Sequence, residues 1–207
     1  MRIALLGGTG RIGAEVLGQA LAAGHEVHVL ARRPESLAPR DGLTVVAGDA
    51  LDAGAVGEAV GGSDAVVSAL GPRGPRSPGL LAGAAGVTVA AMADRGVTRL
   101  VAVSAAGAFI AADRDTSALV RLILPRVLAR PFADVRRMEA AVRATNLHWT
   151  LVRPVRLTNK PLTGTHRVRP DVPPPHARTI GRADVAQFIL TVLGNDGWLK
   201  SAPALAY

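Results

Sequence analysis

The sequence predicts an α/β fold, a doubly wound parallel sheet with helices on both faces, in a single domain of residues 1–207. Short apolar segments alternate with alanine-rich helical segments along most of the chain, as in repeated strand-helix-strand units. Hydrophobic residues make up 49% of the chain and aromatic residues only 3%, so small aliphatic side chains must fill the core, as in buried parallel strands. No linker-like stretch divides the 207 residues, a length that suits one domain.

The first half of the chain shows the alternation most clearly. Strands are expected at residues 2–6, 26–31, 43–47 and 64–70, and helices up to about residue 23 and at 51–60 and 80–95. Gly24 and His25 end the first helix, and Arg32-Arg33-Pro34 closes the second strand. This alternation predicts right-handed crossovers and a ligand site at the carboxyl ends of the strands.

The second half is less regular. A strand is expected at 99–104, a helix at about 133–144, a strand at 148–152 and a last helix at 181–193. A basic and apolar stretch at 119–130 is interrupted by Pro125, and residues 170–176 carry four prolines and predict a surface loop. We expect loops within residues 105–180 to form the substrate side of the molecule.

A glycine-rich turn, Gly7-Gly8-Thr9-Gly10-Arg11-Ile12-Gly13, follows the first strand and opens the first helix. Gly8, Gly10 and Gly13 have the dinucleotide spacing, and Gly7, Gly10 and Gly13 equally fit the spacing of short-chain dehydrogenases. In both, bare backbone N–H groups approach a pyrophosphate at a helix start, and Gly13 lets the helix lie close to the strand. A turn kept only for packing would not need three glycines at this spacing. The turn therefore predicts a Rossmann-type dinucleotide site.

Arginines stand where an NAD-binding unit would carry an acidic residue. Arg32 and Arg33 follow the second strand, and a guanidinium offers a fork of donors to a phosphate that an acid would repel. NADPH, or NADP in the oxidised form, is therefore expected to be preferred over NAD. The alternative is a pair of solvated surface arginines.

Further cofactor contacts are expected where the next two strands end. Asp49, with Ala50 beside it, is placed to meet the adenine amino group, although Asp49 could equally cap the following helix. Ala69, Leu70 and Gly71 end the fourth strand beside the expected path of the cofactor.

Several segments together resemble the atypical short-chain dehydrogenases of the NAD(P)H-binding, NmrA-like type. They are the glycine turn, Arg32, and residues 46–49, 64–71 and 149–154. Within that group, Pro161-Leu162-Thr163-Gly164, residues 180–188 and Tyr207 are most similar to the flavin reductases, also called biliverdin-IXβ reductases.

The resemblance implies a set of cofactor contacts and a reaction. The contacts would be Gly7, Thr9, Gly10, Arg11, Ile12, Arg32, Asp49, Leu70, Gly71, Arg73 and Pro154. Such enzymes transfer a hydride from NADPH to a flavin or a linear tetrapyrrole, largely by stacking the acceptor on the nicotinamide, and for this chain we expect a flavin, quinone or tetrapyrrole-like acceptor.

The chain departs from the family at its proton-handling positions. The Tyr-x-x-x-Lys pair of carbonyl-reducing members aligns with Pro131 and Val135, so ordinary ketone reduction is not expected. The serine of flavin reductases aligns with Ala105, next to Ser104, and its histidines align with Val135 and Arg156.

Ser104 and Arg156 remain as catalytic candidates. Ser104 could hydrogen-bond the nicotinamide amide or the acceptor, and Arg156 could bind an acidic group of the acceptor. Their alternatives are a strand-end serine satisfied by backbone and an ordinary surface arginine.

Other classes of site are not expected. The five histidines lack ligand spacing, so no metal site is predicted, and no Gly-x-Ser-x-Gly segment supports a hydrolase. The net charge of +8 is scattered and stacking aromatics are few, which argues against nucleic acid. No apolar run spans a membrane, and Pro125 favours a helix over the cleft or a partner surface at 118–130 rather than a membrane-surface helix.

The overall expectation is a cytoplasmic protein, a monomer or weak homo-oligomer, without cysteines and with no targeting signal at Met1. Two functions stay open. One is an NADPH-dependent reductase of the flavin-reductase kind with a small-molecule acceptor. The other is a non-catalytic NADP(H)-binding sensor or regulatory protein, in which the missing Tyr and Lys would be expected.

Overall fold

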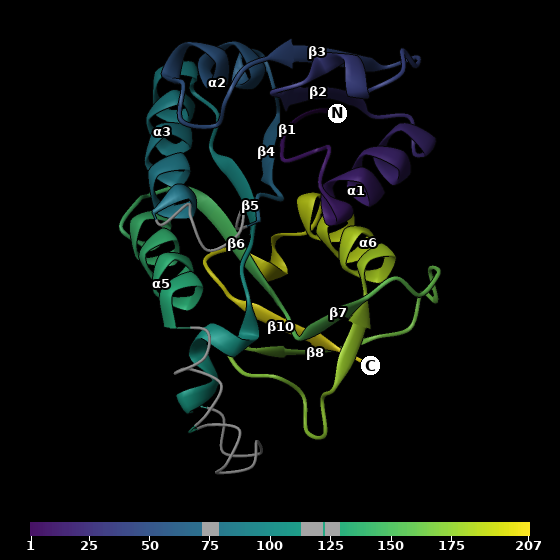
Figure 1. Ribbon diagram of the computed structural model, residues 1–207, viewed down its shortest axis with the longest axis vertical. Coiled ribbons are helices and arrows are strands. Elements are labelled where there is room, and N and C mark those ends of the chain that lie inside the picture. The colour runs from purple at the N-terminus through teal and green to yellow at the C-terminus, as the bar shows by residue number, and fades with distance from the viewer. Residues whose placement is uncertain (72–78, 113–121, 123–128) are drawn as a thin grey trace.

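A sheet of eight strands runs through the part of the chain that the computed structural model describes, residues 1–71, 79–112, 122 and 129–207 (Figure 1). Its order is β3-β2-β1-β4-β5-β6-β10-β8. The strands are β1 (Arg2–Leu6), β2 (Glu26–Ala31), β3 (Leu43–Ala47), β4 (Ala65–Ser68), β5 (Arg99–Val103), β6 (His148–Pro154), β8 (Arg167–Pro170) and β10 (Pro203–Ala206). The order β3-β2-β1-β4-β5-β6 is that of the Rossmann fold, so the predicted fold class is confirmed.

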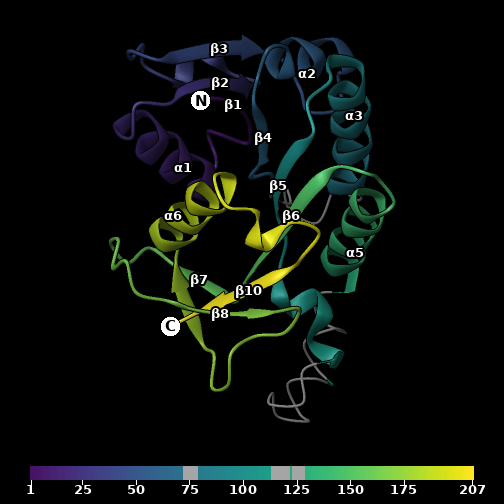
Figure 2. The ribbon, with the colours of Figure 1, turned by 180° about the vertical axis from the view of Figure 1, so that it is seen from behind.

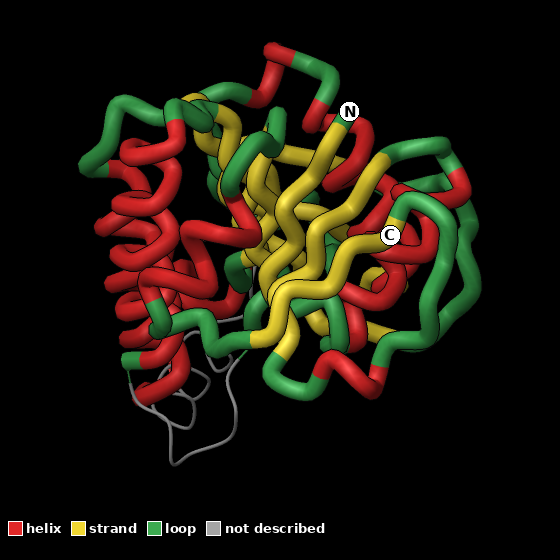
Figure 3. Tube along the Cα trace, turned by 90° about the horizontal axis from the view of Figure 1, so that it is seen from above, coloured by secondary structure: helices red, strands yellow, loops and turns green. Residues whose placement is uncertain are grey.

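Helices cover both faces of the sheet, as the views from the front, from behind and from above show (Figures 1, 2 and 3). One face carries α1 (Arg11–Ala22) and α6 (Arg182–Leu193), and the other carries α2 (Ala53–Val60), α3 (Leu80–Arg95) and α5 (Ala129–Arg143). Each face has its own core of mainly aliphatic side chains, because the central strands are buried on both sides. None of the helices in the described ranges is long and apolar enough to cross a membrane.

The structure differs from the sequence-based expectation mainly after residue 154. Four short strands were not expected: β8, β10, and the pair β7 (Arg156–Thr158) and β9 (Thr179–Gly181), which forms a separate two-stranded sheet. The main sheet is also not wholly parallel, since β8 runs antiparallel to β10 at its edge. These strands are only three or four residues long, so local pattern does not reveal them.

Two helices begin at other residues than expected. The helix α2 begins at Ala53 rather than at residue 51, because the side chain of Asp52 caps it by accepting from the N–H groups of Gly54 (2.9 Å) and Ala55 (3.2 Å). The helix α5 begins at Ala129, four residues earlier than the expected start at 133. The stretch 118–130, with Pro125, lies almost entirely outside the described residues.

The first turn of α3 is capped from another helix. Its N-cap residue, Gly79, has no side chain to offer, and the buried carboxylate of Asp134 on α5 accepts from the N–H groups of Leu81 (2.9 Å) and Ala82 (3.3 Å) instead. A buried carboxylate at a helix N-terminus satisfies donors that would otherwise lack partners. Asp134 therefore joins α3 to α5.

We expect Asp134→Ala to lower the free energy of unfolding by about 1 to 2 kcal/mol, the cost of losing a cap and leaving buried donors unpaired. Urea unfolding followed by circular dichroism measures this difference. Asp94→Ala, an exposed aspartate on α3, is the matched control and should stay within about 0.5 kcal/mol of the parent. Equal effects of the two substitutions would contradict the capping role.

Candidate dinucleotide-binding site

The glycine turn between β1 and α1 is tightly packed. Gly7 has a φ of 84°, which favours glycine, and a Cβ atom there would lie 2.8 Å from the carbonyl carbon of Ala69. A Cβ atom on Gly13 would overlap the carbonyl oxygen of Gly7. The start of α1 thus lies directly against the turn, as the sequence predicts for Gly13.

The packing accounts for more of the glycines than the sequence argument allowed. A Cβ atom on Gly8 would lie 2.6 Å from a methyl carbon of Val29 on β2, so Gly7, Gly8 and Gly13 are each required by close neighbours. Packing therefore accounts for two of the three glycines in either spacing, whereas a Cβ atom on Gly10 would lie 3.1 Å from the carbonyl oxygen of Gly7, a tight contact without overlap. The case for a ligand has to rest on the helix start and on the pocket in front of it.

The start of α1 leaves its first N–H groups without a side-chain cap. Gly10 is the N-cap residue, its N–H donates to the carbonyl oxygen of Gly7 (2.9 Å), and no acidic residue lies in the first turn. The first N–H groups of a helix and its dipole attract an anion. This end of α1 fits the pyrophosphate of a dinucleotide.

A pocket of about 130 Å³ opens where β1, β2, β3 and β4 end. It lies at the point where the strand order reverses between β1 and β4, which is where ligands bind in open α/β sheets. Eight of its lining residues were expected from the sequence: Gly7, Thr9, Gly10, Arg32, Ala50, Ala69, Leu70 and Gly71. Leu30, Ala31 and Gly48 also line it, at or just after the ends of β2 and β3, and were not predicted from the sequence as cofactor contacts.

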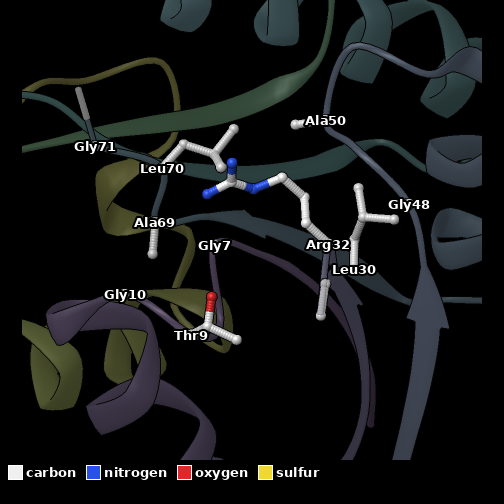
Figure 4. A pocket seen from close by; sticks show the side chains of 11 residues that line it. Gly7, Thr9, Gly10, Leu30, Arg32, Gly48, Ala50, Ala69, Leu70 and Gly71 are labelled. Carbon is white, nitrogen blue, oxygen red and sulfur yellow. The ribbon is translucent and has the colours of Figure 1, made fainter. Parts of the chain in front are cut away.

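Of the described residues that line the pocket, Arg32 is the only charged one. Figure 4 shows its side chain leaving the end of β2 with the guanidinium directed into the pocket, toward the side lined by Leu70. The side chain is exposed, which leaves the guanidinium accessible to an anionic ligand.

The other predicted cofactor residues do not line the pocket: Gly8, Arg11, Ile12, Gly13, Arg33, Asp49, Ser104 and Pro154. Ile12 is buried in the core, and Arg11 is the exposed first residue of α1. Arg33 precedes the 3₁₀ turn η1 (Pro34–Ser36), and Pro154 is the buried last residue of β6. Arg73 lies outside the described residues.

Asp49 is placed beside the pocket but does not cap α2. Its Oδ1 accepts from the N–H of Leu51 (3.0 Å), and the cap of α2 is Asp52. The capping alternative for Asp49 is therefore wrong.

Ser104 belongs to a buried cluster of polar side chains next to the strand ends that form the pocket. It follows β5, and its hydroxyl donates to Oε1 of Glu139 on α5 (2.5 Å). Arg153 of β6 donates to both oxygens of the same carboxylate, from Nε to Oε1 (2.8 Å) and from Nη2 to Oε2 (2.6 Å). Exposed fractions of 1% for Glu139 and 4% for Arg153 make this a buried, bidentate ion pair.

Sequence reasoning missed the roles of Glu139 and Arg153. A signal was available, because Glu139 lies one helical turn from Val135 and next to Met138 on the buried side of α5. An acidic residue at such a position needs a partner. Which arginine supplies it depends on how α5 packs against β6.

Neither Arg156 nor Val135, two other positions aligned with proton-handling residues of the family, provides a proton donor in hydrogen-bonding contact with Ser104. Arg156 is exposed on β7 in the small second sheet, and neither a hydrogen bond nor an ion pair links it to Ser104 in the described part of the chain. Val135, at the position of the family's lysine, is buried and apolar. Within the described ranges, no group of His, Cys, Asp or Glu side chains could hold a metal ion.

A third buried carboxylate, Asp184 on α6, joins the segment after β7 to the rest of the molecule. Its Oδ1 accepts from the N–H groups of Thr163 (3.0 Å) and Gly164 (2.9 Å) and from the Thr163 hydroxyl (2.8 Å), and its Oδ2 accepts from the Tyr207 hydroxyl (2.6 Å). Burial alone would raise the pKa of Asp184, but the hydrogen bonds from Tyr207, Thr163 and Gly164 outweigh it and lower the pKa below its ordinary value.

We expect Tyr207→Phe to lower the free energy of unfolding at pH 7 by about 2 kcal/mol, since it removes the hydrogen bond to the charged, buried Asp184 and the one that the hydroxyl accepts from the N–H of Gly181. A carboxyl group with a lowered pKa in the folded state stabilises the fold above its unfolded pKa of about 4, and this contribution is lost as the pH falls through the folded pKa. The difference between parent and variant should therefore shrink below about pH 4. Urea unfolding at a series of pH values tests this, and a difference that grows on acidification would contradict it.

Comparisons with known proteins agree with this geometry. The family model described as NAD(P)H-binding matches residues 7–196. Similar solved structures include a wide-type short-chain dehydrogenase/reductase from Veillonella parvula in complex with NADP, with 18% identity, coverage of 100% of this chain and 94% of that one, and a TM-score of 0.85. A provisionally named NADH-flavin reductase from Streptococcus pneumoniae is 22% identical over 100% and 99% of the two chains, with a TM-score of 0.83.

A third similar structure is the oxidoreductase ylbE from Lactococcus lactis, with 20% identity over 100% of this chain and 90% of that one, and a TM-score of 0.82. At these identities the structural likenesses show a shared fold. The family match spans most of the chain, including the glycine turn, the end of β2 and the end of β4. The chain therefore belongs to the NAD(P)H-binding family.

Proposed function

We propose that the protein binds NADPH in the pocket at the ends of β1 to β4 and transfers a hydride to a planar small-molecule acceptor of the flavin, quinone or tetrapyrrole class. The observation that carries this proposal is the position of Arg32, whose guanidinium reaches into a pocket that also contains the start of α1. Bound NADPH supplies the hydride, and with one proton from solvent the products are NADP and the doubly reduced acceptor.

The chain's own residues would bind and orient the dinucleotide. The uncapped N–H groups of α1 would hold the pyrophosphate, and Arg32 would hold the 2′-phosphate by a charge-assisted, forked contact. The adenine would lie toward Ala50 and Asp49, and Leu70 and Gly71 would direct the nicotinamide toward β5. Arg11, at the first position of α1, would add positive charge beside the pyrophosphate.

The residues near Ser104 favour an acceptor that needs no proton donor from the protein. Pro131 and Val135 cannot transfer a proton, and the hydroxyl proton of Ser104 is directed at Glu139. Flavins and quinones fit, because their reduced forms can take a proton from solvent. The NADP complex of the Veillonella protein and the name of the Streptococcus protein support the cofactor and the acceptor class.

Steady-state oxidation of NADPH, followed at the nicotinamide absorbance with FMN, riboflavin and quinones as acceptors, tests the proposed reaction. We expect turnover with at least one of them. Tight binding of NADPH without turnover on any acceptor would overturn the enzymatic assignment.

That outcome would favour a second function, a non-catalytic sensor in which NADPH binding changes a surface used by a protein partner. The specific observation in its favour is the lack of a proton-handling side chain at Pro131 and Val135. Isothermal titration with NADPH distinguishes the sensor from a protein that does not bind the dinucleotide at all.

A further inference from the structure

Ser104 continues the row of strand ends that forms the pocket. Ser68 of β4 is level with Ala102 of β5, so Leu70 and Ser104 each lie two residues beyond these paired positions. Neighbouring strands are about 4.8 Å apart. Leu70 lines the pocket, and Ser104 therefore lies one strand further along, on the side away from Arg32.

The hydrogen-bonding state of Ser104 is set by Glu139. A serine hydroxyl has one proton and two lone pairs, whereas a carboxylate can only accept. Because the Ser104 oxygen lies 2.5 Å from Oε1 of Glu139, its single proton is committed to that contact. The oxygen of Ser104 then has only acceptor capacity left for a ligand.

Arg153 keeps the carboxylate of Glu139 in this orientation. Besides its two bonds to Glu139, its Nη1 donates to the backbone oxygen of Asp171 (2.8 Å), and its guanidinium carbon lies 3.7 Å from the ring centre of Phe109. Rotation of Glu139 away from Ser104 would break a buried bidentate ion pair. Arg153 of β6, itself bound to the segment after β8, therefore holds Glu139 of α5 in contact with Ser104.

We propose that Glu139 is a positioning residue that makes Ser104 a hydrogen-bond acceptor at the nicotinamide end of the site, so that this end binds an N–H donor such as the nicotinamide carboxamide and does not stabilise a carbonyl or alkoxide oxygen. The inference rests on the proposed function. It gives a physical reason, beyond the missing Tyr and Lys, why the site does not suit ketone reduction, since Ser104 cannot donate to a developing oxyanion.

The test compares the binding of NADP with that of its 3-acetylpyridine analogue, in which a methyl group replaces the NH₂ of the carboxamide. Both keep the carbonyl oxygen, and they differ in that only NADP has N–H donors on the substituent of the pyridine ring. Isothermal titration of the parent should show NADP binding about tenfold more tightly, the worth of one hydrogen bond whose loss leaves a buried acceptor unpaired. In Ser104→Ala the two dinucleotides should bind about equally.

The role of Glu139 needs a variant that removes the acceptor without leaving a buried charge. Glu139→Met with Arg153→Met replaces the ion pair by apolar side chains of similar length, a change that buried pairs often tolerate. Ser104 is then free to donate to the carbonyl that both dinucleotides share, so their affinity ratio should fall toward one although Ser104 is present. Arg137→Met, at an exposed position of α5, should keep the ratio of the parent.

Binding of adenosine 2′,5′-bisphosphate, which lacks the nicotinamide half, checks that each variant keeps the adenosine side of the site. An affinity ratio that is the same in the parent and in Ser104→Ala, or a parent that prefers the acetyl analogue, would overturn the proposal. An affinity ratio that stays near tenfold in the double variant would show that Glu139 does not set the hydrogen-bonding state of Ser104. If neither dinucleotide binds the parent, the proposed function itself fails, and that result is distinct from all the others.

Discussion

Gly13→Ala is expected to destabilise the fold by about 3 kcal/mol or more and to weaken NADPH binding at least 100-fold, because a single methyl group would occupy the position of backbone atoms. The added Cβ atom would overlap the carbonyl oxygen of Gly7 and lie 2.8 Å from the Cα atom of Gly8. Neither neighbour is a side chain that can rotate away. The start of α1 would have to move from the turn, and its N–H groups would move with it.

Gly18→Ala is the matched control for this substitution. Gly18 lies on the same helix, and apart from its chain neighbours and the backbone of its own helix no described atom lies within 4 Å of a Cβ atom built on it. Alanine there should stabilise the fold by about 0.5 to 1 kcal/mol, as it generally does in a helix interior, and should leave NADPH affinity unchanged. Thermal unfolding and isothermal titration on both variants measure the contrast. If the two variants behaved alike, the close approach of α1 to the turn would not matter for either property.

Arg32→Asp is expected to reverse the cofactor preference, lowering the NADPH-to-NADH affinity ratio by about 100-fold or more. Hydrogen bonds to a charged group contribute about 1.5 to 3 kcal/mol, which corresponds to roughly 10- to 100-fold in affinity. Repulsion between Asp and a 2′-phosphate adds to this loss, whereas Asp can accept from the 2′-hydroxyl of NADH. The ratio of dissociation constants, measured by titration of both dinucleotides, tests the expectation.

Arg33→Asp separates direct contact from overall charge. Arg33 is exposed, carries the same charge and is next in sequence, but it does not line the pocket. It should change the ratio much less than Arg32→Asp does, and the small change should disappear at higher salt. Equal effects of the two substitutions would assign the preference to the general field of the basic protein. An unchanged ratio in Arg32→Asp would overturn the role of Arg32.

The sequence was most informative about the parts of the site that depend on backbone conformation and on residues close together in the chain. The glycine turn, Arg32, and the residues after β4 are placed within a few residues of strand ends that local pattern identifies, and the structure gathers them around one pocket. The sequence was least informative for side chains that act across the fold. Ser104 could be named as a candidate, but its partner Glu139 is 35 residues away on a helix, and Arg153 reaches the same carboxylate from another strand.

In the glycine turn, the spacing motif identifies the right residues but gives only part of the reason why they are glycine. Gly8 fits a spacing motif, yet in the structure its small size is required by Val29 of the neighbouring strand. A motif gives the spacing of residues along the chain, and the neighbours that demand this spacing are visible only after the strands have paired.

The order of strands and helices up to β6, the bare helix start and the basic residue beyond β2 follow from the sequence alone, because periodicity, glycine and charge act over a few neighbouring residues. The antiparallel β8, the cap that Asp134 provides for α3 and the acceptor state of Ser104 were decided by tertiary structure. Each of these depends on a partner from a distant segment, and the energy of that contact exists only once burial has brought the two groups together.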